Sequence, residues 1–229
     1  MGVSIIQNTL FKKIFMLVTL TIVLLTTLTS CTSSQDEKEE LIRPKNAELI
    51  FSEVVNVYVQ KTINPNNIHL ITIRNSLKHL PQSIKDILVE NKYEIYLVSD
   101  ISDVSKNGNT KSNGKHDIEN RLIMVEFTTI DPSKTLLHEV GHAFDWGNSY
   151  EKMRYSTNSD FKNAMSEEVK DLFNQNVFTG DSEEYLSHVS DNQDEYFAEC
   201  FALYFSNEIY KEKLSVFAPK TYVFINNLF

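Results

Sequence analysis

Cysteine is scarce in this sequence, which argues against a fold held together by disulfide bonds. The 229 residues contain two cysteines, Cys31 and Cys200. If Cys31 is modified at the end of an export signal, as argued below, no disulfide can form within the chain. Cys200 lies in the apolar stretch 197–202, where a thiol is more typical of a small core residue than of a nucleophile. The sequence therefore predicts a domain that is stabilised by its hydrophobic core.

Positive charge is also in short supply, and this argues against two classes of partner. The chain has 22 basic and 31 acidic residues, a net charge of −9 at pH 7. Residues 1–30 contain two lysines and no acidic residue, so the rest of the chain carries 20 basic and 31 acidic residues, a net charge of −11. We therefore expect no binding to nucleic acid and no electrostatic docking on anionic lipid.

The sequence has no apolar stretch that is long enough for a comfortable membrane span. Near its start, two lysines precede an apolar segment, residues 14–25, of only about a dozen residues, and small polar residues follow it. This order is typical of a secretory signal peptide, which we place at residues 1–30.

The end of this segment is more specific than an ordinary export signal. Residues 28–31 (Leu-Thr-Ser-Cys) resemble a bacterial lipobox, and a polar, acidic stretch follows at once. We therefore predict a lipid on Cys31 and a flexible tether at residues 31–40, with the protein exported to the cell envelope and anchored to the outer face of a bacterial membrane. The alternative is a plain signal peptide or an N-terminal membrane anchor with an incidental cysteine.

Residues 41–229 show no internal repeat and no sharp change of composition, so we predict one domain of the α+β class. Apolar spacing favours helices at residues 41–58 and 80–89. Residues 93–98 and 121–127 are apolar enough for strands, and the latter is the nearer candidate for an edge strand that pairs with an extended substrate. Residues 105–115, which are rich in Lys, Asn and Gly, predict an exposed loop.

A metal-binding pattern, H-E-x-x-H, lies in the middle of the chain. His138 and His142 are four residues apart, so a helix places their imidazoles on one face, where they can bind a single Zn²⁺ ion. Glu139, offset around the helix axis, is placed to act as the general base of a zinc hydrolase. Pro-Ser at 132–133 and Gly-Asn at 147–148 mark the ends of this helix. The alternative is that the two histidines and the glutamate lie on a partly exposed helix and bind no metal.

The third ligand is expected from a second helix, residues 194–205. Glu195 and Glu199 lie one turn apart on it, so Glu195 can bind zinc while Glu199 hydrogen-bonds a ligating imidazole. The alternative is that both glutamates are solvated. The longer H-E-x-x-H-x-x-G-x-x-H pattern is excluded, because position 145 is Asp and position 148 is Asn. Asp145 is either a further support for a ligand or a helix-terminal aspartate bound to solvent.

Three motifs in this order carry a resemblance to a known family: residues 138–145 (His-Glu-Val-Gly-His-Ala-Phe-Asp), 195–199 (Glu-Tyr-Phe-Ala-Glu) and 218–227 (Ala-Pro-Lys-Thr-Tyr-Val-Phe-Ile-Asn-Asn). Together they resemble the catalytic domain of anthrax toxin lethal factor, a domain type that also occurs in clostridial Pro-Pro endopeptidases. The resemblance covers roughly residues 80–229. It implies a zincin-type domain, with a small mixed sheet packed on the H-E-x-x-H helix and a mainly helical C-terminal half.

The resemblance also implies a gluzincin-like zinc endopeptidase with one Zn²⁺ ion bound by His138, His142 and Glu195, and with Glu139 as base. The sequence departs from the family at one position. The family has a tyrosine seven residues before the glutamate ligand, where its hydroxyl can stabilise an oxyanion, and this chain has His188. His188 could take over that role. Alternatively, a small shift of register could bring in Tyr185, or His188 could be a surface histidine.

We therefore expect a zinc-dependent endopeptidase that acts outside the cytoplasm on protein or peptide substrates, with proline-containing bonds among the candidates. The alternative is a catalytically weak or inactive surface lipoprotein that uses the same fold as a binding module. The altered tyrosine position is the only support for that alternative.

Overall fold

The computed structural model describes residues 41–64, 68–104, 112–147, 154–178 and 183–229. The predicted signal peptide, the predicted lipidation site Cys31 and the predicted tether lie outside the described residues. Among the helices within these ranges, none is both long enough and apolar enough to cross a membrane.

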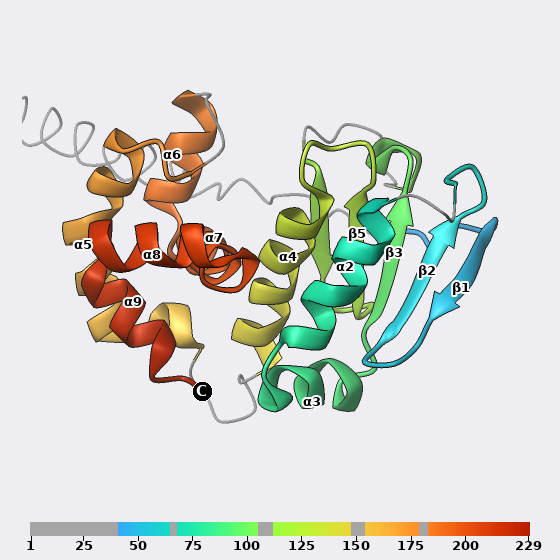
Figure 1. Ribbon diagram of the computed structural model, residues 1–229, viewed down its shortest axis with the longest axis horizontal. Coiled ribbons are helices and arrows are strands. Elements are labelled where there is room, and N and C mark those ends of the chain that lie inside the picture. The colour runs from blue at the N-terminus through green and yellow to red at the C-terminus, as the bar shows by residue number, and fades with distance from the viewer. Residues whose placement is uncertain (1–40, 65–67, 105–111, 148–153, 179–182) are drawn as a thin grey trace, which may run out of the picture. The chain divides into compact units, whose positions relative to one another are not determined.

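Five short strands form a mixed sheet at the N-terminal end of the described chain (Figure 1). The two central strands, β3 (Glu94–Val98) and β5 (Leu122–Glu126), pair in parallel and are almost entirely buried, as continuous apolar runs predict. Both confirm the predicted strands. The order β1-β2-β3-β5-β4 is completed by the remaining strands, β1 (Ala47–Phe51), β2 (Asn56–Gln60) and β4 (Gly114–Asp117).

The predicted helix at residues 41–58 is wrong, because this stretch contains β1 and most of β2, paired antiparallel. The physical reason is a period of two that competes with the helical spacing. Val55, Val57 and Val59 are all buried and alternate with Asn56 and Tyr58, which are less so. Branched side chains favour an extended backbone, and parallel pairing of β2 with β3 decides the outcome.

The predicted edge strand is also wrong. β5 lies between β3 and β4, so both of its edges are paired. Among the described residues the last strand on the side of the long helix α4 is β4, and β4 begins at Gly114, inside the stretch 105–115 that was predicted to be a loop. The first part of that loop prediction, residues 105–111, lies outside the described residues.

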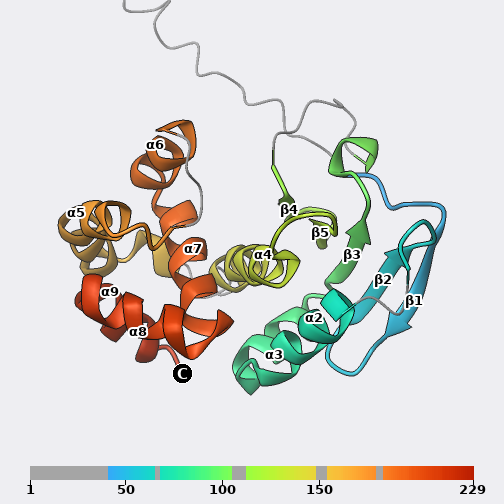
Figure 2. The same cartoon turned by 45° about the horizontal axis from the view of Figure 1, so that its top comes forward.

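Three helices cover one face of the sheet: α2 (Ile68–His79), α3 (Gln82–Glu90) and α4 (Pro132–Gly147) (Figure 2). The helix α3 confirms the predicted helix at residues 80–89, and Ile84 and Leu88 are the residues that it buries. On the sheet, Ile95 and Ile123 point into the large core beneath these helices, whereas Tyr96 and Met124 belong to a smaller cluster on the opposite face.

The C-terminal half is helical, as predicted: α5 (Ser159–Asn174), α6 (Glu183–Asp191), α7 (Gln193–Ser206), α8 (Glu208–Phe217) and α9 (Pro219–Asn226). The central helix of this half is α7, in which every residue from Tyr196 to Leu203 is buried. Helices that are buried on all sides are apolar all round, and this stretch is so apart from Glu199. Cys200 is fully buried within it, in agreement with a core role.

The helix α4 lies between the sheet and α7, and it crosses α7 at a glycine (Figures 1 and 2). A Cβ atom added at Gly141 would lie 3.0 Å from Ala198 Cα and 3.2 Å from the side chain of Phe201. A side chain at this position would have to push the two helices apart by a few tenths of an ångström, and glycine avoids this. The crossing therefore brings the polar face of α4, with His138, directly against Glu199 on α7.

Candidate metal centre

The helix α4 places the two motif histidines where one ion can meet both. Pro132 occupies the first position of α4, and Asp131 Oδ1 accepts a hydrogen bond from the Lys134 backbone nitrogen at 3.0 Å, so the predicted helix start is confirmed. One turn apart on the helix, His138 Nε2 and His142 Nε2 approach to 3.2 Å. The neighbouring apolar residues of α4 are buried and hold this face in place: Leu136, Leu137, Val140, Ala143 and Phe144.

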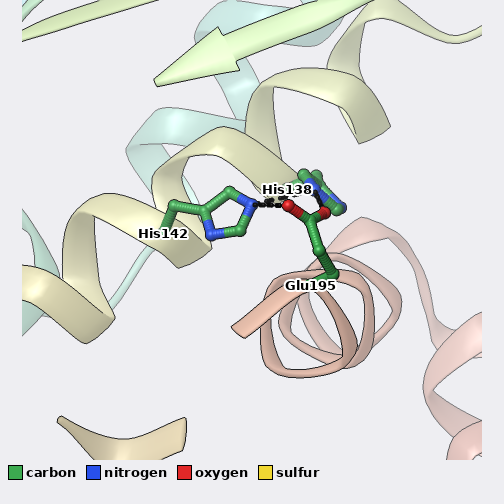
Figure 3. Close-up of side chains that lie close together, drawn as sticks. All are labelled: His138, His142 and Glu195. Atoms are coloured by element: carbon green, nitrogen blue, oxygen red, sulfur yellow. Dashed lines mark hydrogen bonds and ion pairs between the residues drawn. The ribbon is translucent and has the colours of Figure 1, made fainter. Parts of the chain in front are cut away.

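A carboxylate from α7 joins the two imidazoles (Figure 3). Glu195 Oε2 lies 3.3 Å from His138 Nε2, and Glu195 Oε1 lies 3.6 Å from His142 Nε2. One atom from each of the three residues lies within 4.8 Å of the others. The three side chains that the sequence predicts as metal ligands are thus brought together.

The distances fit zinc. Zinc–ligand bonds of about 2.0–2.2 Å in tetrahedral geometry place two ligand atoms roughly 3.3–3.5 Å apart. The three observed separations, 3.2, 3.3 and 3.6 Å, agree with this spacing to within a few tenths of an ångström. Two imidazoles and one carboxylate are also the ligand set of a catalytic rather than a structural zinc site, because they leave a fourth position for water or substrate.

The electrostatics of the cluster favour a cation at the point where the ligands meet. Burial lowers the pKa of His138, but hydrogen bonds to Glu195 and Glu199 outweigh it and raise this pKa to about 10. Burial raises the pKa of Glu195, yet hydrogen bonds with His138 and His142 hold it well below its usual range. Such a cluster stabilises positive charge, as a metal site must.

Behind the ligands, Glu199 contacts the outer nitrogen of His138, as the sequence predicts. Its Oε2 lies 3.0 Å from His138 Nδ1, and its Oε1 lies 2.5 Å from Lys134 Nζ. Burial raises the pKa of Glu199, but the charge of Lys134 and the hydrogen bond to His138 bring it down to about 2. Sequence reasoning missed Lys134. Its only signal in the sequence was its position, one helical turn before the first histidine.

Glu139 lies beside the ligands and is almost completely buried, with 6% of its surface exposed. Burial raises the pKa of its carboxyl group. Its side chain packs against the edge strand, because a Cβ atom added at Gly114 would lie 2.6 Å from Glu139 Oε1 and 2.7 Å from Thr135 Cγ2. Gly114 therefore makes room for the carboxylate of Glu139. Sequence reasoning missed this glycine because it counted only as a loop residue.

We expect the Gly114→Ala variant to lower kcat for peptide cleavage by about 10- to 100-fold. The added methyl group would overlap the Glu139 carboxylate and push it away from the position in which it acts as base. Zinc affinity should stay unchanged, since Gly114 does not touch the three ligands. Steady-state kinetics and zinc titration measure the two quantities. Asn113→Ala, at the exposed neighbouring position, is the control and should behave like the wild type. An unchanged kcat in Gly114→Ala would mean that the position of Glu139 does not matter.

Asp145 was predicted either to support a metal ligand or to be bound to solvent at the end of the helix, and the structure shows neither. It is fully buried, which contradicts the solvent-bound alternative. Its two carboxylate oxygens accept hydrogen bonds from Ser156, one from the backbone nitrogen at 2.8 Å and one from Oγ at 2.6 Å. Ser156 belongs to the short 3-10 helix η3 (Tyr155–Thr157). Asp145 thus fastens this helix to the end of α4, and its hydrogen bonds go to Ser156 rather than to an imidazole.

The two candidates for oxyanion stabilisation both lie on α6, next to the cluster. His188 Nε2 is 3.4 Å from Glu195 Oε1, and 56% of the His188 side chain is exposed. Tyr185 is more deeply placed. Burial raises the pKa of its hydroxyl group, and a hydrogen bond to Glu199 adds to this effect.

A third histidine, His116 on β4, stands next to the ligands and was missed because it lies just after the stretch predicted to be a loop. Its ring stacks on that of His142 with a centroid distance of 6.2 Å and an interplanar angle of 5°. His116 Nε2 lies 2.8 Å from the hydroxyl oxygen of the buried Tyr93. Burial lowers the pKa of His116 to about 3, so this imidazole is neutral. His116 therefore places an uncharged ring against the ring of His142.

Comparisons with known proteins agree with this geometry. The family described as anthrax toxin lethal factor, N- and C-terminal domain, matches residues 45–228. Among solved structures, the chain is similar to the Pro-Pro endopeptidase PPEP-2 from Paenibacillus alvei, with a TM-score of 0.56 and 21% sequence identity over 76% of this chain and 97% of that one. This likeness confirms the predicted fold class. A comparison with curated protein sequences finds no match.

Proposed function

Because the chain belongs to the anthrax toxin lethal factor family, we propose that it is a zinc-dependent endopeptidase with His138, His142 and Glu195 as ligands. The observation that carries the proposal is the convergence of two imidazoles from α4 and one carboxylate from α7 at zinc-binding distances. These groups come from two segments more than fifty residues apart in the sequence. If the glutamate were simply solvated on a helix surface, it would have no reason to lie against the two histidines.

The surrounding residues fit the roles that peptide hydrolysis needs. Zinc, when bound, supplies Lewis acidity, which activates a water molecule and polarises the scissile carbonyl group. Glu139 accepts the proton of the attacking water and returns a proton to the leaving amine. Its raised pKa suits this double role, because a base whose pKa lies nearer to the working pH also serves better as the acid. Glu199 holds the His138 imidazole with Nε2 turned toward the other ligands.

For the oxyanion, we propose His188 as the donor. Its imidazole lies beside Glu195 on the exposed side of the cluster, whereas the Tyr185 hydroxyl is engaged by Glu199. We expect His188→Ala to lower kcat by about 10²- to 10³-fold, the usual effect of removing an oxyanion donor, and Tyr185→Phe to lower it less. Steady-state kinetics of both variants decide between the residues. The reverse order of effects would assign the role to Tyr185.

The edge strand β4 supports a substrate bound in extended form. Among the described residues β4 is the last strand of the sheet, and it lies next to α4, so a peptide that adds to the sheet there would run past Glu139. By its name, PPEP-2 cleaves between prolines, and we propose Pro-Pro bonds as the first specificity to test.

We further propose that the enzyme acts outside the cytoplasm, exported and lipid-anchored through Cys31. The support for this part of the proposal is the lipobox-like sequence at residues 28–31. Metabolic labelling with a radioactive or clickable fatty acid should mark the wild type but not the Cys31→Ala variant. Labelling of both proteins would refute the anchor.

One experiment tests the proposed activity. The purified domain should bind one zinc ion per chain and should cleave members of a mixed peptide library, which includes Pro-Pro sequences, only in its zinc-loaded form. Mass spectrometry of the products identifies the cleaved bonds. Stoichiometric zinc without any cleavage would favour the alternative function, a non-catalytic binding module, whose support is the histidine in place of the family tyrosine.

A further inference from the structure

Lys134 occupies a place where a lysine is unfavourable on two grounds. Only 6% of its surface is exposed, and burying an ammonium group is strongly unfavourable unless it is paired. It also lies in the first turn of α4, where the positive end of the helix dipole repels a cation. A lysine in such a place needs a strong local partner.

That partner is Glu199, which also contacts a metal ligand. Lys134 Nζ lies 2.5 Å from Glu199 Oε1, and the other oxygen of the same carboxylate lies 3.0 Å from His138 Nδ1. One carboxylate oxygen thus contacts the ammonium group and the other contacts the imidazole, and the Tyr185 hydroxyl group is a further partner of this carboxylate. The ring of Tyr210 on α8, 5.7 Å from Nζ, helps to enclose the ammonium group. The three residues form a chain of contacts, Lys134–Glu199–His138, that crosses from α4 to α7 and back.

The order of contacts has a consequence for the metal ligand. A carboxylate with one free oxygen can rotate about its terminal bond, whereas one that binds a cation on one oxygen presents the other in a fixed direction. Glu199 Oε2 is then held where it accepts a hydrogen bond from His138 Nδ1. This contact fixes the tautomer of His138 and leaves Nε2 with its lone pair toward Glu195 and His142.

We propose that Lys134 is a positioning residue for His138 and sets the zinc affinity of the site through Glu199, without touching any ligand atom. This inference rests on the proposed zinc site. The competing explanation is that the Lys134–Glu199 pair only fastens α4 to α7. The two differ in what they predict, because a fastening role changes the stability of the fold, whereas a positioning role changes the dissociation constant of zinc in the folded protein.

The test compares zinc dissociation constants, measured by competition with a chromophoric chelator, in folded variants. Lys134→Met should weaken zinc binding by about 10- to 100-fold, the usual cost of losing an outer contact of a ligand. Lys134→Arg should recover most of the affinity, since it keeps the charge. The matched control is Glu168→Gln, which alters another buried carboxylate, one that accepts hydrogen bonds from the backbone nitrogens of Lys220 and Thr221. It should lower the melting temperature and leave zinc affinity unchanged.

A double-mutant cycle completes the test. It also keeps the proposal testable if the Lys134→Met variant fails to fold. Lys134→Met combined with Glu199→Gln removes both charges of the buried pair together, which is tolerated better than removing one. If Lys134 acts through Glu199, this double variant should bind zinc as Glu199→Gln does. A further loss in the double variant, or wild-type affinity in folded Lys134→Met, would overturn the inference. Absence of zinc binding by the wild type itself would instead refute the proposed function.

Discussion

Replacing Glu139 with glutamine lowers the turnover of a cleaved peptide by about 10²- to 10⁴-fold, and replacing it with alanine has an effect at least as large, because the carboxylate serves as base and then as acid. We expect both variants to bind zinc with wild-type affinity, since Glu139 is not among the three residues that converge on the metal position. Glutamine keeps the shape of the buried side chain and isolates the chemical effect from any loss of packing.

The kinetic and binding measurements are made on the same preparations, with turnover from library-derived peptides and metal content from elemental analysis. Glu168→Gln is again the control, because it exchanges the same groups at a buried position away from the cluster and should retain turnover. If Glu139→Ala still cuts peptide at the wild-type rate, Glu139 is not the base.

We expect the Glu195→Ala variant to bind zinc much more weakly than the wild type, because it removes one of three ligands. The loss of zinc affinity should exceed the roughly 10- to 100-fold that is typical when a residue supporting a ligand is removed. The same loss is visible in thermal unfolding. Zinc at 100 times its dissociation constant stabilises the folded protein by about 2.7 kcal/mol. For a domain of this size, that corresponds to a rise in Tm of about 5–10 °C in the wild type, which Glu195→Ala should not show.

A matched control lies at the preceding position. Asp194 carries the same charge on the same turn of α7, but its Oδ2 lies 3.7 Å from Arg154 Nη1, and it is not part of the ligand cluster. Asp194→Ala should therefore retain the zinc-dependent rise in Tm. Equal rises in Glu195→Ala and the wild type would show that another group completes the metal site.

The sequence predicted the helices α4 and α7 and the three converging side chains well, for a local reason. On α4, His138 and His142 are one turn apart among apolar residues, so helical geometry alone places them together. On α7, Glu199 stands out from a stretch that is otherwise apolar on all sides, and Glu195 lies one turn before it, at the start of that stretch. These patterns need no information about distant parts of the chain.

The misses all depend on contacts between distant segments. The stretch 41–58 fits a helical and a strand-like spacing, and its pairing with β3 decides between them. Gly114 and His116 gain their importance only because β4 pairs with β5 beside α4. Lys134 reads as an ordinary first-turn lysine until Glu199, sixty-five residues later, is placed against it. Local periodicity cannot reveal such pairs.

The crossing of α4 and α7 at Gly141 also affects when activity can arise during folding. A nascent chain that ends before residue 195 contains both histidines and Glu139 but lacks the ligand carboxylate and its neighbour Glu199. It also lacks α7, the helix against which α4 packs on the side away from the sheet. A partly folded chain in which α7 has not yet packed against α4 would therefore be unable to hold the ion in a three-ligand site, and on the proposed export route this packing follows transport across the membrane.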